Sequence, residues 1–183
     1  MLANLEHIII KCKSQDPDAQ KVLYDLYKDT LYAVCLRYIK SAHDAEDVFI
    51  DAFYKIFTKI DHFKGDGSFE GWMRRIMVNE SLMFLRKKTN LHLTVELPDK
   101  EIADVQESDD EDMSFDDIMK VLDELPVGYR TIFNLYVFED MKHREIAEML
   151  GISINTSKSQ LILAKKRLAD ILKKKENLTF KIK

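Results

Sequence analysis

The chain has 183 residues, of which 46% are hydrophobic and 33% charged, and its formal net charge is −4. This composition is ordinary for a globular protein and excludes general disorder. Because the chain holds only 5 glycines and 3 prolines, long helices are favoured over collagen-like, disulfide-rich or many-stranded β folds. With two cysteines, no apolar run long enough to cross a membrane and no signal peptide, we expect a cytoplasmic protein without membrane insertion.

The charge is unevenly distributed along the sequence. Residues 1–90 carry a net charge of +1, residues 91–117 carry −10 and residues 118–183 carry +5. Like charges at the density of the middle segment disfavour compact packing. We interpret this segment either as a solvated interdomain linker or as an acidic strap that occupies a basic groove on a partner. Both interpretations divide the chain into domains.

Helix signals mark the first part of the chain. Asp16 followed by Pro17 predicts a helix start, and apolar residues then recur every three or four positions until about Lys40. A second start signal, Asp44 with Asp47 three residues later, resembles a capping box ahead of the next apolar stripe. The sequence therefore predicts two successive amphipathic helices here.

A third helix is predicted from about Ser68 to Lys88, after a glycine-dense turn. It combines aromatic residues near its start with a polar, mostly basic face. Unstacked bases need an aromatic surface to stack on and cations to neutralise phosphate, although aromatics at this spacing more often belong to a protein core. The residues of this pattern are Phe63, Phe69, Trp72, Arg74, Arg75, Asn79, Arg86, Lys87 and Lys88.

The C-terminal part of the chain predicts a helix-turn-helix motif. Helices are expected over residues 115–125, 127–139 and 143–150. A three-residue turn that opens with glycine and ends on the N-cap Ser153 then precedes a long helix over residues 154–175. This spacing favours DNA binding over a helical hairpin with a solvated basic face.

The last helix carries the residue types that a recognition helix uses. Short polar side chains on its opening turns suit base edges in the major groove, and the later cations suit phosphates. These residues are Asn155, Thr156, Lys158, Ser159, Gln160, Lys165, Lys166 and Arg167. We interpret His143, at the start of the preceding helix, as a surface side chain.

At this point the motifs resemble a known family. Residues 43–88 resemble the second conserved region of bacterial sigma-70-type factors, and residues 122–168 resemble the fourth. Regions one and three are missing and a short linker joins the two, which is the pattern of the extracytoplasmic-function (ECF) sigma factors. The resemblance implies an all-α fold of two small helical domains, residues 1–92 and 114–183, joined by a flexible acidic linker over residues 93–113.

The resemblance also implies a function and partners. Such a factor binds core RNA polymerase, directs it to promoters, melts the −10 region and contacts the −35 duplex, commonly under control of an anti-sigma factor that responds to an envelope or extracellular signal. It is not an enzyme and needs no cofactor. The acidic linker resembles the segment that threads toward the polymerase active-site channel.

The resemblance implies site residues only at the positions of this chain that match the family's motifs. The polymerase-docking helix matches at Asp44, Glu46, Asp47, Asp51 and Lys55, with Ile50 where the family usually has glutamine. The family's positions that bind the single-stranded −10 DNA correspond here to Phe63, Lys64, Phe69, Trp72, Arg75, Asn79, Arg86, Lys87 and Lys88. Of these, Phe63 and Asn79 correspond to positions around a flipped-out base. The family's positions that contact the −35 duplex correspond here to Arg144, Asn155, Thr156, Lys158, Ser159, Gln160, Lys165 and Lys166. Where this chain has Gln160 and Leu163, the family commonly has basic residues.

Two other classes of protein are weaker fits. A helix-turn-helix regulator that works without polymerase would leave the aromatic and basic element around Trp72 without a role. An enzyme would need a site, and the five histidines are scattered without metal-ligand spacing or a nucleophile motif. Because no GxxxxGK[ST] loop is present, DNA opening by this chain would be driven by binding energy.

Overall fold

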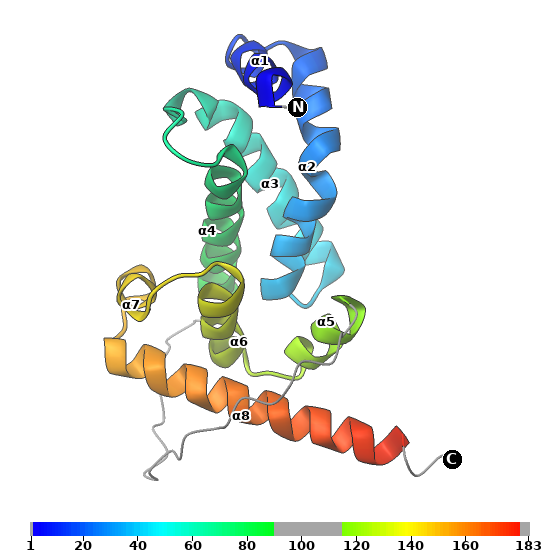
Figure 1. Cartoon of the computed structure of the whole chain (residues 1–183), viewed down its shortest axis with the longest axis vertical. Coiled ribbons are helices and arrows are strands. Elements are labelled where there is room, and N and C mark those ends of the chain that lie inside the picture. Colours follow the sequence, from blue (N-terminus) through cyan, green and yellow to red (C-terminus); the bar gives the residue numbers. More distant parts are fainter. Residues whose placement is uncertain (1, 90–114, 180–183) are drawn as a thin grey trace. The chain divides into compact units, whose positions relative to one another are not determined.

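All regular elements are helical in the computed structural model, which describes residues 2–89 and 115–179 (Figure 1). This confirms the expected fold class. The chain divides into two compact units, Met1–Asn90 and Leu91–Lys183. The linker expected over residues 93–113 lies outside the described residues.

The first unit is a helical bundle. Its elements are α1 (Leu2–Lys13), α2 (Pro17–Tyr38), α3 (Ala42–Lys59), the short 3₁₀ turn η1 (Ile60–His62) and α4 (Phe69–Thr89). Helices α2, α3 and α4 pack against one another in all three pairings, and α1 packs on α2. The start of α2 is as predicted, because Pro17 is its first residue and the Asp16 carboxylate accepts a 2.9 Å hydrogen bond from the Ala19 amide.

The start of α3 differs from the prediction. The N-cap is Ser41, whose backbone is extended and whose hydroxyl accepts a hydrogen bond of 3.3 Å from the Asp44 amide. Helix α3 therefore begins at Ala42, and Asp44 lies in its first turn instead of before it. A serine hydroxyl next to a helix start satisfies an otherwise orphan backbone N–H, so no capping box at Asp44 and Asp47 is needed.

The core of the first unit consists of the faces that α2, α3 and α4 turn toward one another. The Cys35 thiol lies 3.9 Å from the Met77 sulfur at its centre. Each fully buried aliphatic or methionine side chain stabilises the fold by about 1.5–3 kcal/mol. The fully buried core residues include Leu23, Leu31, Val34, Cys35, Tyr38, Ala45, Ala52, Ile56, Met73 and Met77.

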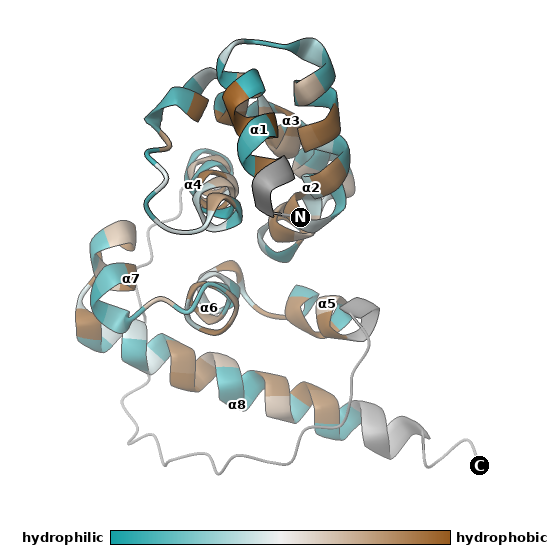
Figure 2. Cartoon of the chain, turned by 45° about the horizontal axis from the view of Figure 1, so that its top comes forward, coloured by the Kyte–Doolittle hydropathy of each residue, from teal (hydrophilic) through white to brown (hydrophobic). Residues whose placement is uncertain are grey.

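The second unit is built around one long helix. Its elements are α5 (Phe115–Asp123), α6 (Val127–Phe133), the π-helical segment η2 (Asn134–Phe138), α7 (His143–Leu150) and α8 (Ile154–Thr179). Helix α8 packs against α5, α6 and α7. Figure 2 shows hydrophobic and hydrophilic residues alternating along α8, as expected for a helix with one buried face. The buried core of this unit includes Val121, Leu122, Leu125, Ile132, Leu135 and Ile146, together with Leu161, Ala164 and Ile171 of α8 itself.

One predicted helix of the second unit is divided. Residues 127–139 form an α-helix only as far as Phe133, after which the Glu139 amide donates to the Asn134 carbonyl oxygen at 3.1 Å. This bond spans five residues, the signature of a π-helix. The chain then turns at Asp140, whose φ is +50°. The turn between η2 and α7 therefore lies where the sequence predicts it.

Candidate nucleic-acid interface

An aromatic cluster of Phe63, Phe69 and Trp72 lies at the start of α4. The rings of Phe69 and Trp72 stack with centroids 5.6 Å apart, and Phe63 contacts both, at 5.0 Å from Phe69 and 5.8 Å from Trp72. Phe63 and Phe69 are buried, whereas Trp72 is half-buried. The indole of Trp72 is therefore the part of the cluster that can meet an external π-face.

The loop before α4 fixes this cluster. Gly65 and Gly67 have φ angles of +87° and +89°, a region that L side chains rarely adopt. The Ser68 hydroxyl accepts a hydrogen bond from the Gly71 amide at 3.2 Å, so serine begins the helix as predicted. Lys13 of α1 donates from Nζ to the Phe63 carbonyl oxygen at 3.0 Å and holds the other end of the loop.

One face of α4 continues from the cluster as an exposed row. Residues three or four apart lie on the same side of a helix, and four residues in line with the half-buried Trp72 are exposed. An aromatic ring, two guanidinium groups, an amide and a thioether side by side can stack on bases and neutralise phosphates. We call this the α4 row; it consists of Trp72, Arg75, Asn79, Met83 and Arg86.

A second exposed face lies on α3, opposite its buried stripe. It combines acidic groups with two large apolar side chains, since Ile50 is 56% and Tyr54 is 70% exposed. A contiguous exposed apolar surface rimmed by charge is typical of a protein-binding site. We call this the α3 face; it consists of Glu46, Asp47, Ile50, Asp51 and Tyr54.

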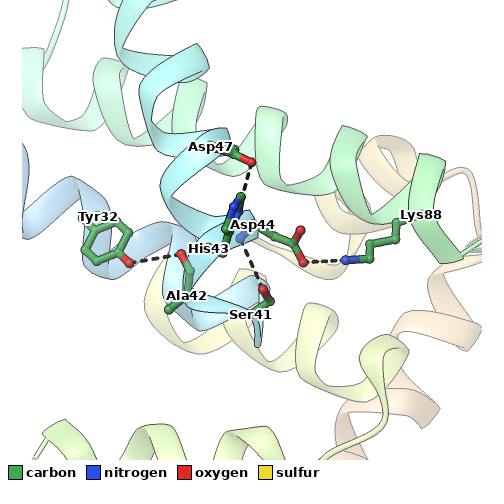
Figure 3. Close-up of polar contacts among 7 residues, drawn as sticks. All are labelled: Tyr32, Ser41, Ala42, His43, Asp44, Asp47 and Lys88. Atoms are coloured by element: carbon green, nitrogen blue, oxygen red, sulfur yellow. Dashed lines mark hydrogen bonds and ion pairs between the residues drawn. The ribbon is translucent and has the colours of Figure 1, made fainter.

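Two further residues expected in polymerase docking are paired within the first unit. Asp44 forms an ion pair with Lys88 of α4, as Figure 3 shows, and Lys55 forms one with Glu80 of α4. The Lys88 ammonium, assisted by the Ser41 hydroxyl, holds the pKa of the Asp44 carboxyl below its usual range. The structure thus places Asp44, Lys55 and Lys88 in contacts between α3 and α4.

Figure 3 also shows how the start of α3 is held. The Tyr32 hydroxyl of α2 donates to the Ala42 carbonyl oxygen at 3.3 Å, and His43 lies 3.3 Å from the Asp47 carboxylate one turn later. Side chains of α2 and α4 therefore contact the first turn of α3. The α3 face begins immediately after a well-anchored helix start.

The helix-turn-helix of the second unit has the predicted geometry. Gly151 ends α7 in the left-handed conformation, with φ +70° and ψ +36°. The Ile152 amide then donates to the Ala147 carbonyl oxygen at 3.0 Å. The Ser153 hydroxyl accepts from the Thr156 amide at 2.9 Å, which caps α8 as predicted. Glycine and serine together produce the sharp turn between the two helices.

The polar residues at the start of α8 lie on two different faces. Ser157 is fully buried and Gln160 is only 4% exposed, on the side that also carries Leu161 and Ala164. The remaining candidates point outward or lie partly exposed on the opposite side. We call that side the α8 face; it consists of Asn155, Lys158, Ser159, Lys165 and Lys166. Gln160 therefore presents almost no surface to a ligand.

The other candidates have mixed placements. Thr156 is half-buried and its hydroxyl lies 2.8 Å from that of Ser153, so it belongs to the cap of α8. Arg144 and Arg167 are exposed, as are Lys64 and Lys87 in the first unit. Arg74 is half-buried on α4, beside the α4 row but not part of it.

Three residues that the sequence did not predict as site residues lie in or beside the candidate interfaces. Tyr54 and Met83 complete the α3 face and the α4 row, and helical spacing from Asp47 and Asn79 would have indicated both. His143 was interpreted as a surface side chain, and this was wrong. It is half-buried, and its ring stacks on that of Tyr136 with centroids 4.8 Å apart. No local pattern in the sequence announces that stacking.

The described parts of the chain show no sign of a metal site or membrane helix. Within residues 2–89 and 115–179, no three histidine, cysteine, aspartate or glutamate residues come together as metal ligands would. None of the helices in these ranges is both long and apolar enough to span a bilayer.

Comparison with known families identifies both units. The family model of sigma-70 region 2 matches residues 23–90, and that of sigma-70 region 4 matches residues 115–168. These ranges contain the α3 face, the aromatic cluster, the α4 row and nearly all of the helix-turn-helix.

Individual relatives agree with the family models. The chain is 30% identical over 165 residues to the ECF RNA polymerase sigma factor SigW of Bacillus subtilis, covering 84% of this chain and 88% of SigW. It is 29% identical over 150 residues to the RNA polymerase sigma factor SigV of the same organism, covering 82% of this chain and 89% of SigV. A similar solved fold is the sigma factor RpoE from Bartonella quintana, at a TM-score of 0.55 and 23% identity, covering 84% of this chain and 96% of RpoE.

Proposed function

Because this chain belongs to the ECF group of sigma-70 family RNA polymerase sigma factors, we propose that its exposed helical faces divide the work of transcription initiation. The α3 face binds core RNA polymerase, the aromatic cluster with the α4 row holds the opened −10 strand, and the α8 face contacts the −35 duplex. The observation that carries this assignment is the α4 row, because a helix-turn-helix protein that binds only duplex DNA has no use for it.

The α3 face supports polymerase docking through its composition. Ile50 and Tyr54 supply exposed apolar area, and Asp47 and Asp51 flank them with negative charge. Apolar area contributes affinity, whereas the charges steer encounter and set the orientation of the partner. Asp44 and Lys55 are engaged with α4, so we assign them to holding the helix that carries this face.

The −10 assignment follows from exposure within the aromatic cluster. Since Phe63 and Phe69 are buried beneath Trp72, we assign the first two to support and Trp72 to stacking on a base. Asn79 offers an amide donor and acceptor in line with it, which suits the edge of a captured base. Arg75 and Arg86, on the same side of α4, neutralise the backbone of the strand.

The −35 assignment rests on the α8 face. Asn155, Lys158 and Ser159 occupy the opening turns, where a recognition helix meets base edges. Lys165 and Lys166 follow two turns later and suit phosphates, together with Arg144 of α7. Because it is buried, Gln160 is left out of this interface.

The family's members are transcription factors, and we propose that this chain catalyses no reaction of its own. Opening DNA costs a few kcal/mol for each unstacked step, and stacking contributes about 1–3 kcal/mol per base. Binding energy from the aromatic cluster and the α4 row can therefore offset part of that cost. We propose a cytoplasmic site of action, because a sigma factor works where core polymerase meets chromosomal DNA.

Regulation by an anti-sigma factor fits the same surfaces. The similar RpoE of Bartonella quintana is in complex with the anti-sigma factor NepR. We propose that this chain is likewise held by an anti-sigma partner that covers the α3 face and releases it on a cell-envelope or extracellular signal. Exposed Ile50 and Tyr54 are the side chains that such a partner would bury.

The first test is run-off transcription with core polymerase from the same species, with and without this chain, on fragmented genomic DNA of its source. Discrete new transcripts are expected, and aligning their start sites identifies both promoter elements. Asp51→Arg is expected to abolish them by repelling the polymerase surface, whereas the matched control Asp29→Arg, at an exposed position on α2, is expected to retain them. Absence of transcripts with an active core would refute the proposal.

A second test separates this function from that of a free-standing regulator. Outside its acidic segment the chain is only mildly basic, with +1 over residues 1–90 and +5 over residues 118–183, so its affinity for promoter DNA without polymerase is expected to be weak and strongly salt-dependent. Gel-shift titration over a range of salt concentrations measures this. Nanomolar, sequence-specific binding by the isolated chain would favour the regulator instead.

A further inference from the structure

His143 connects three elements of the second unit. It is the first residue of α7, and its imidazole stacks on the ring of Tyr136 from η2 at 4.8 Å and 25°. Its Nδ1 lies 2.9 Å from the hydroxyl oxygen of Ser157 on α8, and the two atoms share a hydrogen bond. The ring is thus fixed on one side by stacking and on the other by a directional polar contact.

Ser157 lies at a sensitive place on α8. Its side chain is fully buried, one turn beyond the cap Ser153. Asn155, two residues before it, and Lys158, the next residue, belong to the α8 face. A contact at Ser157 therefore sets the rotation of the helical segment whose outer side we assign to the −35 bases.

We propose that His143 is a positioning residue for promoter recognition, which fixes the rotation of α8 through its hydrogen bond to Ser157 and never touches DNA itself. This inference rests on the proposed function of the α8 face. It adds a residue pair, one from each helix of the motif, that determines how well the −35 element is discriminated from other duplex DNA.

Helix geometry shows why one bond matters here. The surface of a helix lies about 5 Å from its axis, so a rotation of about 10° moves a surface group by about 1 Å. A binding constellation has to be held within about 0.5 Å of its productive geometry. Apolar packing on α5, α6 and α7 fixes the overall phase of α8, and a directional hydrogen bond between a half-buried and a buried group adds a restraint at its opening turns.

The surroundings of the ring favour its neutral form. Burial, with a smaller contribution from the nearby Lys158 ammonium, lowers the pKa of His143 below its ordinary value. Tyr136 stacks on the ring, Lys158 acts on it electrostatically, and Lys142, Arg144 and Glu145 are its charged neighbours at the start of α7. In a neutral imidazole one ring nitrogen accepts, which matches a hydroxyl donor at Ser157.

Three variants separate the bond from the ring. His143→Phe keeps an aromatic ring against Tyr136 and removes Nδ1, whereas His143→Asn keeps a polar atom near the Nδ1 position and removes the ring. Ser157→Ala removes the other partner with little change in volume. His7→Phe, at an exposed histidine of α1, is the matched control.

The readout is open-complex formation by the holoenzyme on two templates, the promoter mapped by transcription and the same promoter with its −35 element scrambled. A neutral hydrogen bond contributes about 0.5–1.5 kcal/mol, so His143→Phe and Ser157→Ala are expected to lower the preference for the intact element about threefold to tenfold. His143→Asn and His7→Phe are expected to keep it, and combining His143→Phe with Ser157→Ala is expected to cost nothing more.

The outcomes distinguish a failure of the positioning role of His143 from a failure of the function proposed for the α8 face. Equal losses on both templates, or an unchanged preference in His143→Phe and Ser157→Ala, would overturn the positioning role and leave the proposed function intact. If the wild-type holoenzyme itself shows no preference for the intact −35 element, the assignment of the α8 face fails and the positioning role fails with it.

Discussion

Replacing Trp72 by alanine is the most informative change in the first unit. Trp72 is the only half-buried ring of the aromatic cluster, and it begins the α4 row. Polymerase is proposed to bind on α3, through side chains that include Ile50 and Tyr54. The substitution therefore separates DNA opening from polymerase binding, which are carried by different helices.

The magnitude follows from the two roles of the indole. As a stacking surface it contributes about 1–3 kcal/mol per base, which corresponds to a loss of about fivefold to a hundredfold in opening. As a member of the cluster it makes ring contacts with Phe63 at 5.8 Å and Phe69 at 5.6 Å. Each pair is worth about 0.5–1.5 kcal/mol, so unfolding becomes easier by about 1–3 kcal/mol, less than the typical stability of a small domain.

Permanganate reactivity of the −10 thymines measures opening, and co-elution with core polymerase measures docking. Trp72→Ala is expected to reduce the first and retain the second, and Trp72→Phe is expected to lie between it and the wild type. Asn79→Ala gives a control for stability, because this exposed residue can lose its base contact at little cost to folding. Loss of docking in step with loss of opening, at a temperature where the variant remains folded, would refute the separation of faces.

Four other expectations concern the remaining features. Gly151→Ala forces a Cβ into a φ of +70° and is expected to lower the free energy of unfolding by about 1–2 kcal/mol in a thermal melt. Burial raises the pKa of the Cys35 thiol to about 11 and raises that of Cys12, so iodoacetamide at pH 8 should modify neither until the chain is unfolded in urea. Burial lowers the pKa of His143 in the folded chain, so the unfolded chain binds a proton at this imidazole more readily. The free energy of unfolding is therefore expected to fall as pH drops below about 6.5. Urea titrations at several pH values should show this fall, and it should be less steep in His143→Phe. Gln160→Leu, at a buried position whose amide oxygen has no hydrogen-bond partner, is expected to retain −35 preference and thermal stability, whereas a loss of preference alone would return Gln160 to the interface.

Much of the fold could be predicted because the helix boundaries are encoded locally. Asp16 with Pro17, Ser68 and the pair Gly151 and Ser153 each act on backbone groups within a few residues, and all are found where expected. The start of α3 was misplaced because serine and aspartate both cap helices, and only the backbone conformation at Ser41 selects between them.

The candidate sites were predicted less completely, for a different reason. Residue types indicated the segments that we propose for nucleic-acid binding, but they did not indicate which side of each helix is exposed. Ser157 and Gln160 resemble recognition residues in composition, yet they share a face with Leu161 and Ala164 and are buried with them. Tertiary contacts such as that of His143 with Tyr136 join elements whose approach no local pattern predicts.

The family resemblance indicates which helices carry the sites, and the rotational phase of each helix determines which of its residues are exposed for binding. On α3, α4 and α8 the buried stripe fixes the phase through many apolar contacts, and most residues of the α3 face, the α4 row and the α8 face are exposed on the opposite side. A row of side chains on a rigid helix keeps its spacing when a partner binds, whereas a loop would have to be ordered at an entropic cost. The three faces are thus prepared for binding by the same burial that stabilises each unit, and substitutions in the buried stripes are expected to disturb recognition wherever they rotate a helix.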